Sequence, residues 1–297
     1  MRLATFRSDK GPALGVIVED RICPVAELDA DIPSSIRGLI ASGPATLNHL
    51  RNLVGSASGD ALLGLDDVAL LPVILDAPKI ICVGLNYADH AKEGGNKVPD
   101  YPALFLRTNR SMIGAGAPIV KPNCSDTLDY EAELMLIIGK EGRHVRESDA
   151  LDYVFGYSIF NDGSVREFQR KASQWTPGKN FDDTGPVGPW IVTADELPPG
   201  ASGLKIESRL NGKVMQSSNT ANMIVSVPRI IELLSEVMTL EPGDMIAMGT
   251  PEGVGYARTP PTFMQPGDVI EIEIEGLGVL TNPITAERIS HQTEAAE

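Results

Sequence analysis

The chain has 297 residues, of which 42% are hydrophobic and 22% charged, a balance typical of a globular protein rather than a disordered one. Its 25 Lys and Arg residues against 40 Asp and Glu residues give a formal net charge of −15, and so acidic a surface repels phosphate backbones, so we expect no nucleic-acid partner. No apolar run approaches the roughly 18 residues of a membrane span, and no secretion signal stands at the first residues, so we expect a cytoplasmic protein without a membrane partner.

The first part of the chain predicts a small α+β domain with few residues that could do chemistry. The small-residue stretch Gly55–Asp60 is typical of a linker, and Pro72 and Pro78 precede the next strong strand. We therefore expect a domain boundary near residue 74, with a small N-terminal domain at 1–73 and a catalytic domain at 74–297. The predicted elements of the first domain are strands at Leu3–Phe6, Ala13–Val18 and Arg21–Pro24 and helices at Ser35–Ala41 and Leu47–Val54.

Beyond residue 74, apolar and β-branched runs bounded by Gly, Pro, Asn and Asp predict many strands and few helices. One helix is clearly indicated after Ser226, with Pro228 in its first turn and Pro242-Gly243 beyond its end. The predicted strands are Lys79–Gly84, Ala103–Leu106, Glu131–Ile138, Tyr153–Ile159, Trp190–Thr193, Leu204–Leu210, Met245–Met248 and Val269–Ile274.

Two carboxylates enter one of these strands together. Glu131 and Glu133 are two residues apart, so their side chains share a face, and Met135 and Ile137 continue that face. Two buried like charges need a cation, a shared proton or basic partners. The pair alone leaves two interpretations open: a metal site, or a strand start that protrudes into water.

A further carboxylate lies where a later strand ends and a helix begins. Ser164 and Glu167 have the spacing of a capping box, which predicts the start of that helix. Asp162, just before it, is either a turn residue or the third carboxylate of a Mg²⁺ site. Three polar side chains share one face of the helix, which is either solvated or functional: Arg166, Gln169 and Arg170.

His90 and Glu93 are three residues apart in a short helical turn that Gly94-Gly95 would end. A carboxylate on one ring nitrogen fixes the tautomer, and the other nitrogen can then deprotonate water. The alternative is an exposed His beside an exposed Glu.

Lys179 also allows two interpretations. It is either a surface lysine or a positive charge placed where an enolate develops.

Five motifs follow one another along the chain, and their ordered combination resembles the fumarylacetoacetate hydrolase family from about Lys79 to Ile284. This resemblance implies an α+β, mostly β fold, with mixed β-sheets rolled into a distorted sandwich or barrel behind a small N-terminal α+β domain. It also implies a homodimer. The motifs are Asn86-Tyr87-x-x-His90-x-x-Glu93, Tyr130-Glu131-x-Glu133, Asn161-Asp162-x-Ser164-x-Arg166 with Gln169, Gly178-Lys179-x-Phe181-Asp182 before Pro186-x-Gly188-Pro189, and Gly249-Thr250-Pro251-x-Gly253-Val254-Gly255.

The resemblance also implies roles for individual residues. His90 and Glu93 match the water-activating pair, and Lys179 matches the group that steadies a negative oxygen. The metal, Mg²⁺ or sometimes Mn²⁺ or Ca²⁺, would be held by Glu131, Glu133 and Asp162. The substrate contacts implied are Arg166, Gln169 and Thr250.

These expectations lead to a functional hypothesis with a keto acid as the small-molecule substrate. The main reading is a metal-dependent hydrolase that cleaves a carbon–carbon bond in acylpyruvate-like or β-diketo acids. The alternative is a decarboxylase or isomerase of a related keto dicarboxylic acid, of the oxaloacetate or hydroxyheptadienedioate type. A third possibility, a non-catalytic homologue, is disfavoured because both His90 and Glu93 are present.

The chain departs from the common family pattern at several positions. Gly163 stands where a larger residue is common, and Glu167 stands where Asp is usual. Asp183-Thr184-Gly185 and Arg107-Thr108 also differ from the usual residues. These departures concern the choice of substrate more than the class of enzyme, and they leave the identity of the substrate end that does not chelate the metal open.

Overall fold

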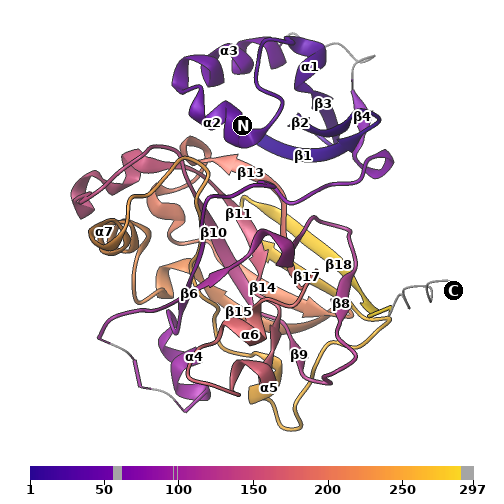
Figure 1. Cartoon of the computed structure of the whole chain (residues 1–297), viewed down its shortest axis with the longest axis vertical. Helices are drawn as coiled ribbons and strands as arrows, with labels where there is room; N and C mark the ends of the chain where they lie inside the picture. The colour runs from indigo at the N-terminus through magenta and orange to yellow at the C-terminus, as the bar shows by residue number, and fades with distance from the viewer. Residues whose placement is uncertain (56–61, 96, 99, 289–297) are drawn as a thin grey trace, which may run out of the picture.

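The computed structural model describes residues 1–55, 62–95, 97–98 and 100–288. Its elements form three sheets and seven α-helices in these ranges (Figure 1). Most of the predicted linker Gly55–Asp60 lies outside the described residues. No helix within the described residues is both long and apolar enough to cross a bilayer.

The largest sheet has eleven strands and contains the N-terminal strands as well as those that carry the site. Its order is β4-β3-β2-β1-β13-β11-β10-β16-β5-β6, with β7 paired to β13. The bounds are β1 Arg2–Ser8, β2 Gly11–Val18, β3 Arg21–Pro24, β4 Leu63–Gly64, β5 Ile80–Gly84, β6 Ala103–Arg107, β7 Met112–Ile113, β10 Ala132–Ile138, β11 Val154–Asn161, β13 Gly185–Thr193 and β16 Met245–Ala247.

Two further sheets and the helices complete the chain. The five-stranded sheet has the order β15-β14-β17-β18-β8, with bounds β8 Ile119–Lys121, β14 Lys205–Leu210, β15 Lys213–Asn219, β17 Val269–Ile274 and β18 Gly278–Ala286. A two-stranded sheet pairs β9 Leu128–Asp129 with β12 Ser164–Val165. The α-helices are α1 Val25–Leu28, α2 Ile36–Ala41, α3 Pro44–Val54, α4 Ala88–Glu93, α5 Arg166–Gln169, α6 Thr176–Lys179 and α7 Val227–Val237. The expected mostly β fold of mixed sheets is confirmed, and the sheets of the described residues do not close into a barrel.

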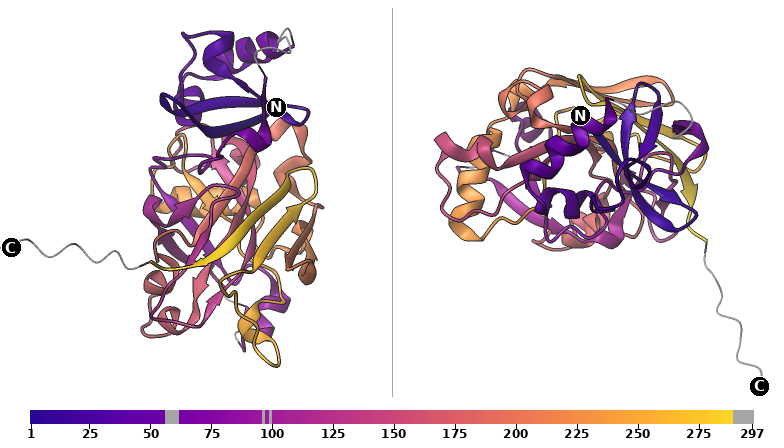
Figure 2. Two further views of the ribbon diagram at one scale, coloured as in Figure 1. Left: turned by 90° about the vertical axis from the view of Figure 1, so that its right-hand side faces the viewer. Right: turned by 90° about the horizontal axis from the view of Figure 1, so that it is seen from above.

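The N-terminal strands and helices lie at one end of the molecule, and Figure 2 shows them above the remaining sheets. Strand β1 pairs with β13, with Arg2 opposite Val192, so these strands continue the main sheet. The strands and helices expected in this segment are present at nearly their predicted bounds. The domain boundary near residue 74 stays a prediction.

Strand β10 is buried on both faces, which explains its uninterrupted apolar sequence. Leu134 and Leu136 pack with Ile230 of α7 and Ile272 of β17. On the other face, Met135 and its alternate neighbours pack with residues of the N-terminal helices, including Ile36, Leu39 and Leu50. A strand enclosed in this way cannot let its first residues protrude into water.

Helix α7 confirms the predicted helix after Ser226. The Ser226 hydroxyl accepts a hydrogen bond from the backbone N–H of Arg229, and Pro228 stands in the first turn. Apolar residues at helical spacing then bury one side of the helix against the core.

The predicted capping box is wrong. Helix α5 begins at Arg166, and Ser164 lies in β12, where it pairs with Asp129 of β9. The Ser164 hydroxyl donates to the backbone oxygen of Asp162 at 2.7 Å, and the Glu167 N–H donates to the Thr127 hydroxyl. Ser164 is therefore part of a strand pair, and neither it nor Glu167 caps the helix.

Gly163 is required by a close approach between two segments. A Cβ at this position would overlap the backbone oxygen of Thr184, which cannot move aside as a flexible side chain would. We expect Gly163→Ala to lower the free energy of unfolding by about 1–3 kcal/mol, the usual cost of overpacking. Urea denaturation of the metal-free protein measures this loss.

The matched control is Gly55→Ala, where the nearest atom to an added Cβ is the Asn52 oxygen at 3.7 Å and the backbone is already helical. We expect this variant to lose no stability. Equal stability of Gly163→Ala and the natural chain would contradict the proposed steric constraint.

Candidate active site

Two neighbouring strands bring three carboxylates together. Strands β10 and β11 are antiparallel with Ala132 opposite Asn161, so the start of one meets the end of the other. The Asp162 N–H donates to the Glu131 backbone oxygen at 3.0 Å and holds the two ends together. One carboxylate oxygen of each of Glu131, Glu133 and Asp162 lies within 4.8 Å of the others. All three residues are at most 4% exposed.

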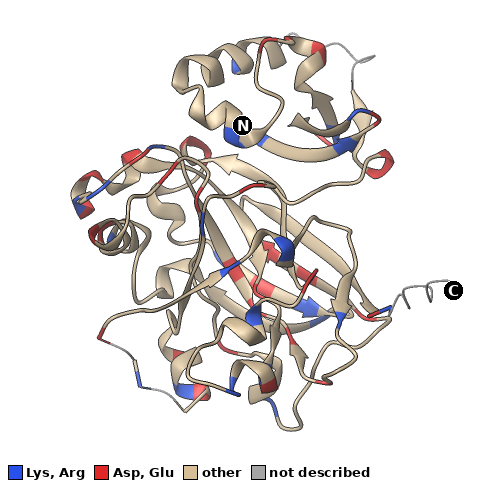
Figure 3. Cartoon of the chain, in the orientation of Figure 1, with Lys and Arg blue, Asp and Glu red and all other residues tan. Residues whose placement is uncertain are grey.

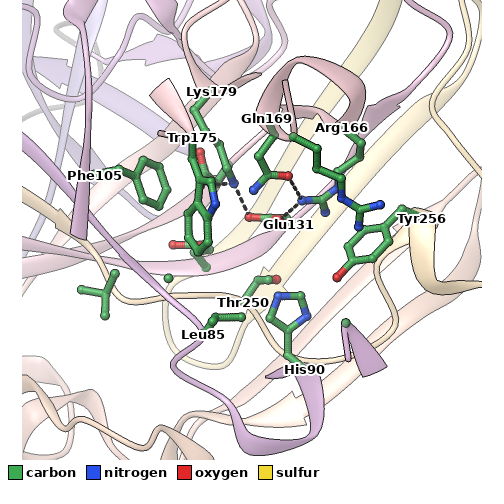
Figure 4. Close-up of a pocket in the computed structure, with 16 residues that line it drawn as sticks. Leu85, His90, Phe105, Glu131, Arg166, Gln169, Trp175, Lys179, Thr250 and Tyr256 are labelled. Atoms are coloured by element: carbon green, nitrogen blue, oxygen red, sulfur yellow. Dashed lines mark hydrogen bonds and ion pairs between the residues drawn. The ribbon is translucent and has the colours of Figure 1, made fainter. Parts of the chain in front are cut away.

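Two of these carboxylates are paired with buried cations. Lys179 Nζ lies 2.6 Å from Glu131 Oε2 and 2.6 Å from Asp162 Oδ2 (Figure 4). Arg166 Nη1 lies 2.6 Å from Glu131 Oε1. Burial opposes ionisation of Glu131, but Lys179 and Arg166 outweigh it and lower the pKa of that carboxyl to about 2.

Arg107 is a third buried cation at this cluster, and sequence analysis did not assign it there. Its Nη1 lies 2.6 Å from Asp162 Oδ1, and both side chains are fully buried. The same guanidinium donates to the Gly163 backbone oxygen at 3.1 Å and to the Thr184 hydroxyl at 3.0 Å. In the sequence, the one feature that could have indicated this role is that Arg107 directly follows the apolar predicted strand Ala103–Leu106.

Three of the residues that depart from the family pattern lie at the carboxylate cluster. Arg107, Gly163 and Thr184 form one contiguous group against Asp162. The Arg107 guanidinium reaches Asp162, Gly163 and Thr184 together because it has several donors in a fixed plane.

Among the described residues, no Lys or Arg forms an ion pair with Glu133, the remaining carboxylate of the cluster. It accepts a hydrogen bond from the Gly249 N–H at 2.9 Å. Burial, together with Asp162 and Glu131, raises its pKa well above the ordinary value of 4.5. The cluster therefore lacks positive charge on the side of Glu133. Because carboxylate oxygens are the ligands that hard divalent cations prefer, these three residues can hold such a cation.

The predicted contact between His90 and Glu93 is present. His90 Nδ1 lies 2.9 Å from Glu93 Oε1 within helix α4, and His90 is 6% exposed. The Glu93 carboxylate also accepts from the Gly253 N–H at 2.9 Å, so it bridges α4 and the glycine-rich loop after β16. With Nδ1 facing the carboxylate, Nε2 is the ring nitrogen left for a reactant.

A cavity of about 320 Å³ collects these groups. In Figure 4, His90 and Gln169 lie on opposite sides of it, with Glu131 between them. Thr250 lines the cavity, and its hydroxyl accepts from Gln216 Nε2 at 2.8 Å. Eight of the nine predicted site residues line it: His90, Glu131, Glu133, Asp162, Arg166, Gln169, Lys179 and Thr250. The ninth, Glu93, is not part of the lining but contacts His90, which is.

Sequence analysis did not assign the aromatic lining of this cavity. Phe105 and Trp175 meet edge to face, 5.5 Å between ring centroids, and form one wall. Trp175 packs directly on Gly84, where a Cβ would displace the ring. Tyr256 lines the cavity beside Arg166 (Figure 4). Trp175 and Tyr256 stand close to motifs and Phe105 lies in β6, but contacts between distant segments, rather than spacing, bring the three rings to the cavity.

Acidic and basic residues occur along most of the ribbon in the view of Figure 3, while the three carboxylates of the cluster are buried. The cations that surround the cluster are therefore a local feature of an acidic protein. This concentration of buried ion pairs is typical of a functional site rather than of a stabilising core.

Comparison with known proteins supports an enzymatic site of this kind. The family model described as fumarylacetoacetate (FAA) hydrolase C-terminal matches residues 79–285. The oxaloacetate tautomerase YisK of Bacillus subtilis is 41% identical over 302 residues, covering 96% of this chain and 100% of the relative. The mitochondrial oxaloacetate tautomerase fahd2 of Xenopus laevis is 37% identical over 290 residues, covering 96% and 90%.

Solved structures give the same fold. The 2-hydroxyhepta-2,4-diene-1,7-dioate isomerase of Mycobacterium marinum is 33% identical, with a TM-score of 0.76 and coverage of 97% of this chain and 100% of that one. The maleylpyruvate hydrolase of Sphingobium sp. SYK-6, solved with a manganese(II) ion and pyruvate, is 31% identical, with a TM-score of 0.80 and the same coverage.

These comparisons overturn the main functional reading from sequence. Relatives that match over nearly the whole chain are named oxaloacetate tautomerases, and structural relatives include a hydroxyheptadienedioate isomerase. The expected hydrolysis of a carbon–carbon bond is therefore wrong, and the alternative of isomerisation of a keto dicarboxylic acid is the better supported one. The match to the family model over residues 79–285 and the identity to these relatives establish that the chain belongs to the fumarylacetoacetate hydrolase family of enzymes.

Proposed function

We propose that this protein is a metal-dependent tautomerase that interconverts the keto and enol forms of a 2-keto dicarboxylic acid of the oxaloacetate class. The observation that carries the proposal is that the His90–Glu93 pair and the three-carboxylate cluster line or border one cavity. Proton transfer needs a base beside the carbon and positive charge beside the oxygen, and this cavity has both. The names of relatives that match over 96% of the chain support oxaloacetate as the substrate.

We propose Glu131, Glu133 and Asp162 as the ligands of the metal, with Mg²⁺ as the ion used. The charge deficit at Glu133 supports a divalent cation there, and the manganese in a relative supports an ion of this type. When bound, the cation would supply a Lewis acid that polarises the 2-keto group and orients the keto acid.

The chain's own residues would then move the proton. His90 Nε2 takes a proton from C3 of the keto form, solvent supplies a proton to the 2-oxygen, and the imidazolium then releases its own proton to solvent, so the enol has the same composition as the keto acid and the base is restored. Glu93 holds His90 in the required tautomer through Nδ1. Lys179 Nζ, which lies 2.6 Å from oxygens of Glu131 and Asp162, places its charge where negative charge develops on the 2-oxygen. No carbon–carbon bond breaks.

Arg166, Gln169 and Thr250 are proposed to position the substrate. Arg166 Nη1 is 3.0 Å from Gln169 Oε1, so the two side chains support each other. Arg166 Nη2 is buried without a hydrogen-bond partner in the described structure, and such a donor favours an incoming carboxylate. The homodimer implied by the family resemblance stays a prediction.

The base can be tested directly. In the presence of Mg²⁺, the natural protein should accelerate the decay of the ultraviolet absorbance of enol-oxaloacetate, and His90→Gln should reduce kcat by about 10²–10⁴-fold, the usual contribution of general base catalysis. His49→Gln, which removes an exposed histidine paired with Asp29, should leave kcat unchanged. Full turnover by His90→Gln would contradict the assignment of His90 as the base. If the natural protein had no effect on the decay of enol-oxaloacetate, the proposed tautomerase function would be wrong.

The metal site can be tested without turnover. Adding Mn²⁺ should raise the Tm of the natural protein, because an ion that binds only the folded state stabilises it. Glu133→Gln keeps an oxygen for the Gly249 N–H but removes the charge, so this rise should be lost. The exposed Glu236→Gln is the control and should keep the rise. An undiminished rise in Glu133→Gln would contradict the ligand assignment.

The same variant gives a pH signature in the metal-free protein. Because the pKa of Glu133 is raised in the folded state, the folded protein keeps a proton that the unfolded chain loses near pH 4.5. The contribution of Glu133 to stability therefore falls as the pH rises above that value. Between pH 4.5 and neutrality, urea denaturation should show a smaller loss of stability for Glu133→Gln than for the natural protein. An identical pH dependence would contradict the raised pKa.

A further inference from the structure

We propose that Arg170, stacked on Tyr256, binds the second carboxylate of the substrate and so selects dicarboxylic over monocarboxylic keto acids. This inference rests on the proposed tautomerase function and names a residue that decides its substrate class. It concerns the mouth of the cavity rather than the carboxylate cluster.

The backbone brings Arg170 to the same side of the helix as Arg166. Arg170 is the residue that ends α5, its backbone is still helical, and its N–H donates to the Arg166 oxygen at 3.2 Å. Residues four apart project from one face of a helix, and both side chains line the cavity. Both guanidinium groups also contact the Tyr256 ring, with Cζ to ring-centroid distances of 4.5 Å for Arg166 and 4.4 Å for Arg170.

The two arginines differ in whether carboxylates of the protein already neutralise their charge. Arg166 is buried, and its guanidinium pairs with Asp129 at 2.8 Å and Glu131 at 2.6 Å. Arg170 is exposed, and no carboxylate of the described residues lies within ion-pair distance of it; its guanidinium instead stacks on the Tyr256 ring. In a chain with 40 acidic residues, a cation at a cavity mouth that has no acidic partner is available to a ligand.

Among the Arg and Lys side chains that line the cavity in the described chain, Arg170 is the one that no carboxylate neutralises. The keto acid end is committed to the carboxylate cluster and Lys179, whose charge Glu131 and Asp162 already balance. Phe105 and Trp175 form an apolar wall, which would desolvate a carboxylate without compensating it. The Tyr256 wall, by contrast, presents the Arg170 guanidinium, which can bind a carboxylate through two parallel hydrogen bonds.

Tyr256 itself is held in place by a backbone contact. Its N–H donates to Asp129 Oδ2 at 3.0 Å, the same oxygen that pairs with Arg166 Nε. This bond anchors the Tyr256 backbone beside the site, and stacking on the ring reduces the side-chain freedom that Arg170 would lose on binding a carboxylate.

The experiment compares two substrates that dissolve from the solid as enols, oxaloacetate with two carboxylates and phenylpyruvate with one. Ketonisation of each is followed by ultraviolet absorbance in Mg²⁺ for the natural protein, Arg170→Gln and Arg170→Lys. We expect Arg170→Gln to lose about 10–100-fold in kcat/KM for oxaloacetate, mainly through KM, as for a lost charge-assisted hydrogen bond. Phenylpyruvate turnover should change less than about two-fold, and Arg170→Lys should keep most of the activity on oxaloacetate.

A binding measurement separates the subsite from the metal site. Oxalate can occupy only the keto acid end, so its inhibition constant should be unchanged in Arg170→Gln. Arg146→Gln is the control for net charge, since it removes an arginine whose side chain is 78% exposed and which pairs with Asp149 away from the cavity lining. It should behave as the natural protein on both substrates.

The outcomes separate the two proposals. Equal losses on oxaloacetate and phenylpyruvate would mean that Arg170 only supports Tyr256, and no loss on oxaloacetate would mean that it is an ordinary surface residue. Either result overturns this inference while leaving the tautomerase in place. A natural protein inactive on both enols would instead overturn the proposed function itself.

Discussion

The balance of charge around three buried carboxylates is the constraint on which the rest of the site depends. Glu131, Glu133 and Asp162 are forced together because the start of β10 and the end of β11 meet in an antiparallel pair. Arg107, Arg166 and Lys179 compensate two of the three charges. Burying this many ionised groups stabilises a fold poorly compared with apolar packing, so the arrangement has a functional rather than a structural explanation.

The positive charges are distributed unevenly over the three carboxylates. Two carboxylates have cationic partners, and the third, Glu133, is left for a bound cation. Glu131 has a strongly lowered pKa and Glu133 a raised one, although they are two residues apart on one strand face. The difference arises because Lys179 and Arg166 approach from α6 and α5 on the side of Glu131, while Glu133 meets only the Gly249 N–H. A divalent cation held by these carboxylates would supply the positive charge that Glu133 lacks.

Sequence reasoning succeeded where short-range geometry decides the outcome. Alternation along a strand placed Glu131 and Glu133 on one face, and spacing in a helical turn placed His90 against Glu93. It failed where distant segments meet. The Ser164 capping box was lost to pairing with Asp129, and the position of Arg107 depends on a contact 55 residues along the chain. The reaction was misjudged for a different reason, because the proposed base, metal ligands and oxyanion partner would serve cleavage and tautomerisation alike.

The double use of the Glu93 carboxylate ties the base to a second segment of the chain. One carboxylate holds His90 Nδ1 and, at the same time, the Gly253 N–H of the loop that follows β16. Because His90 and Glu93 both belong to α4, the contact that fixes the tautomer would survive a shift of that helix as a unit. The Gly253 N–H instead sets where the oriented imidazole stands relative to the loop that carries Thr250, so the register between helix and loop, rather than the pairing itself, decides how the base faces a bound keto acid.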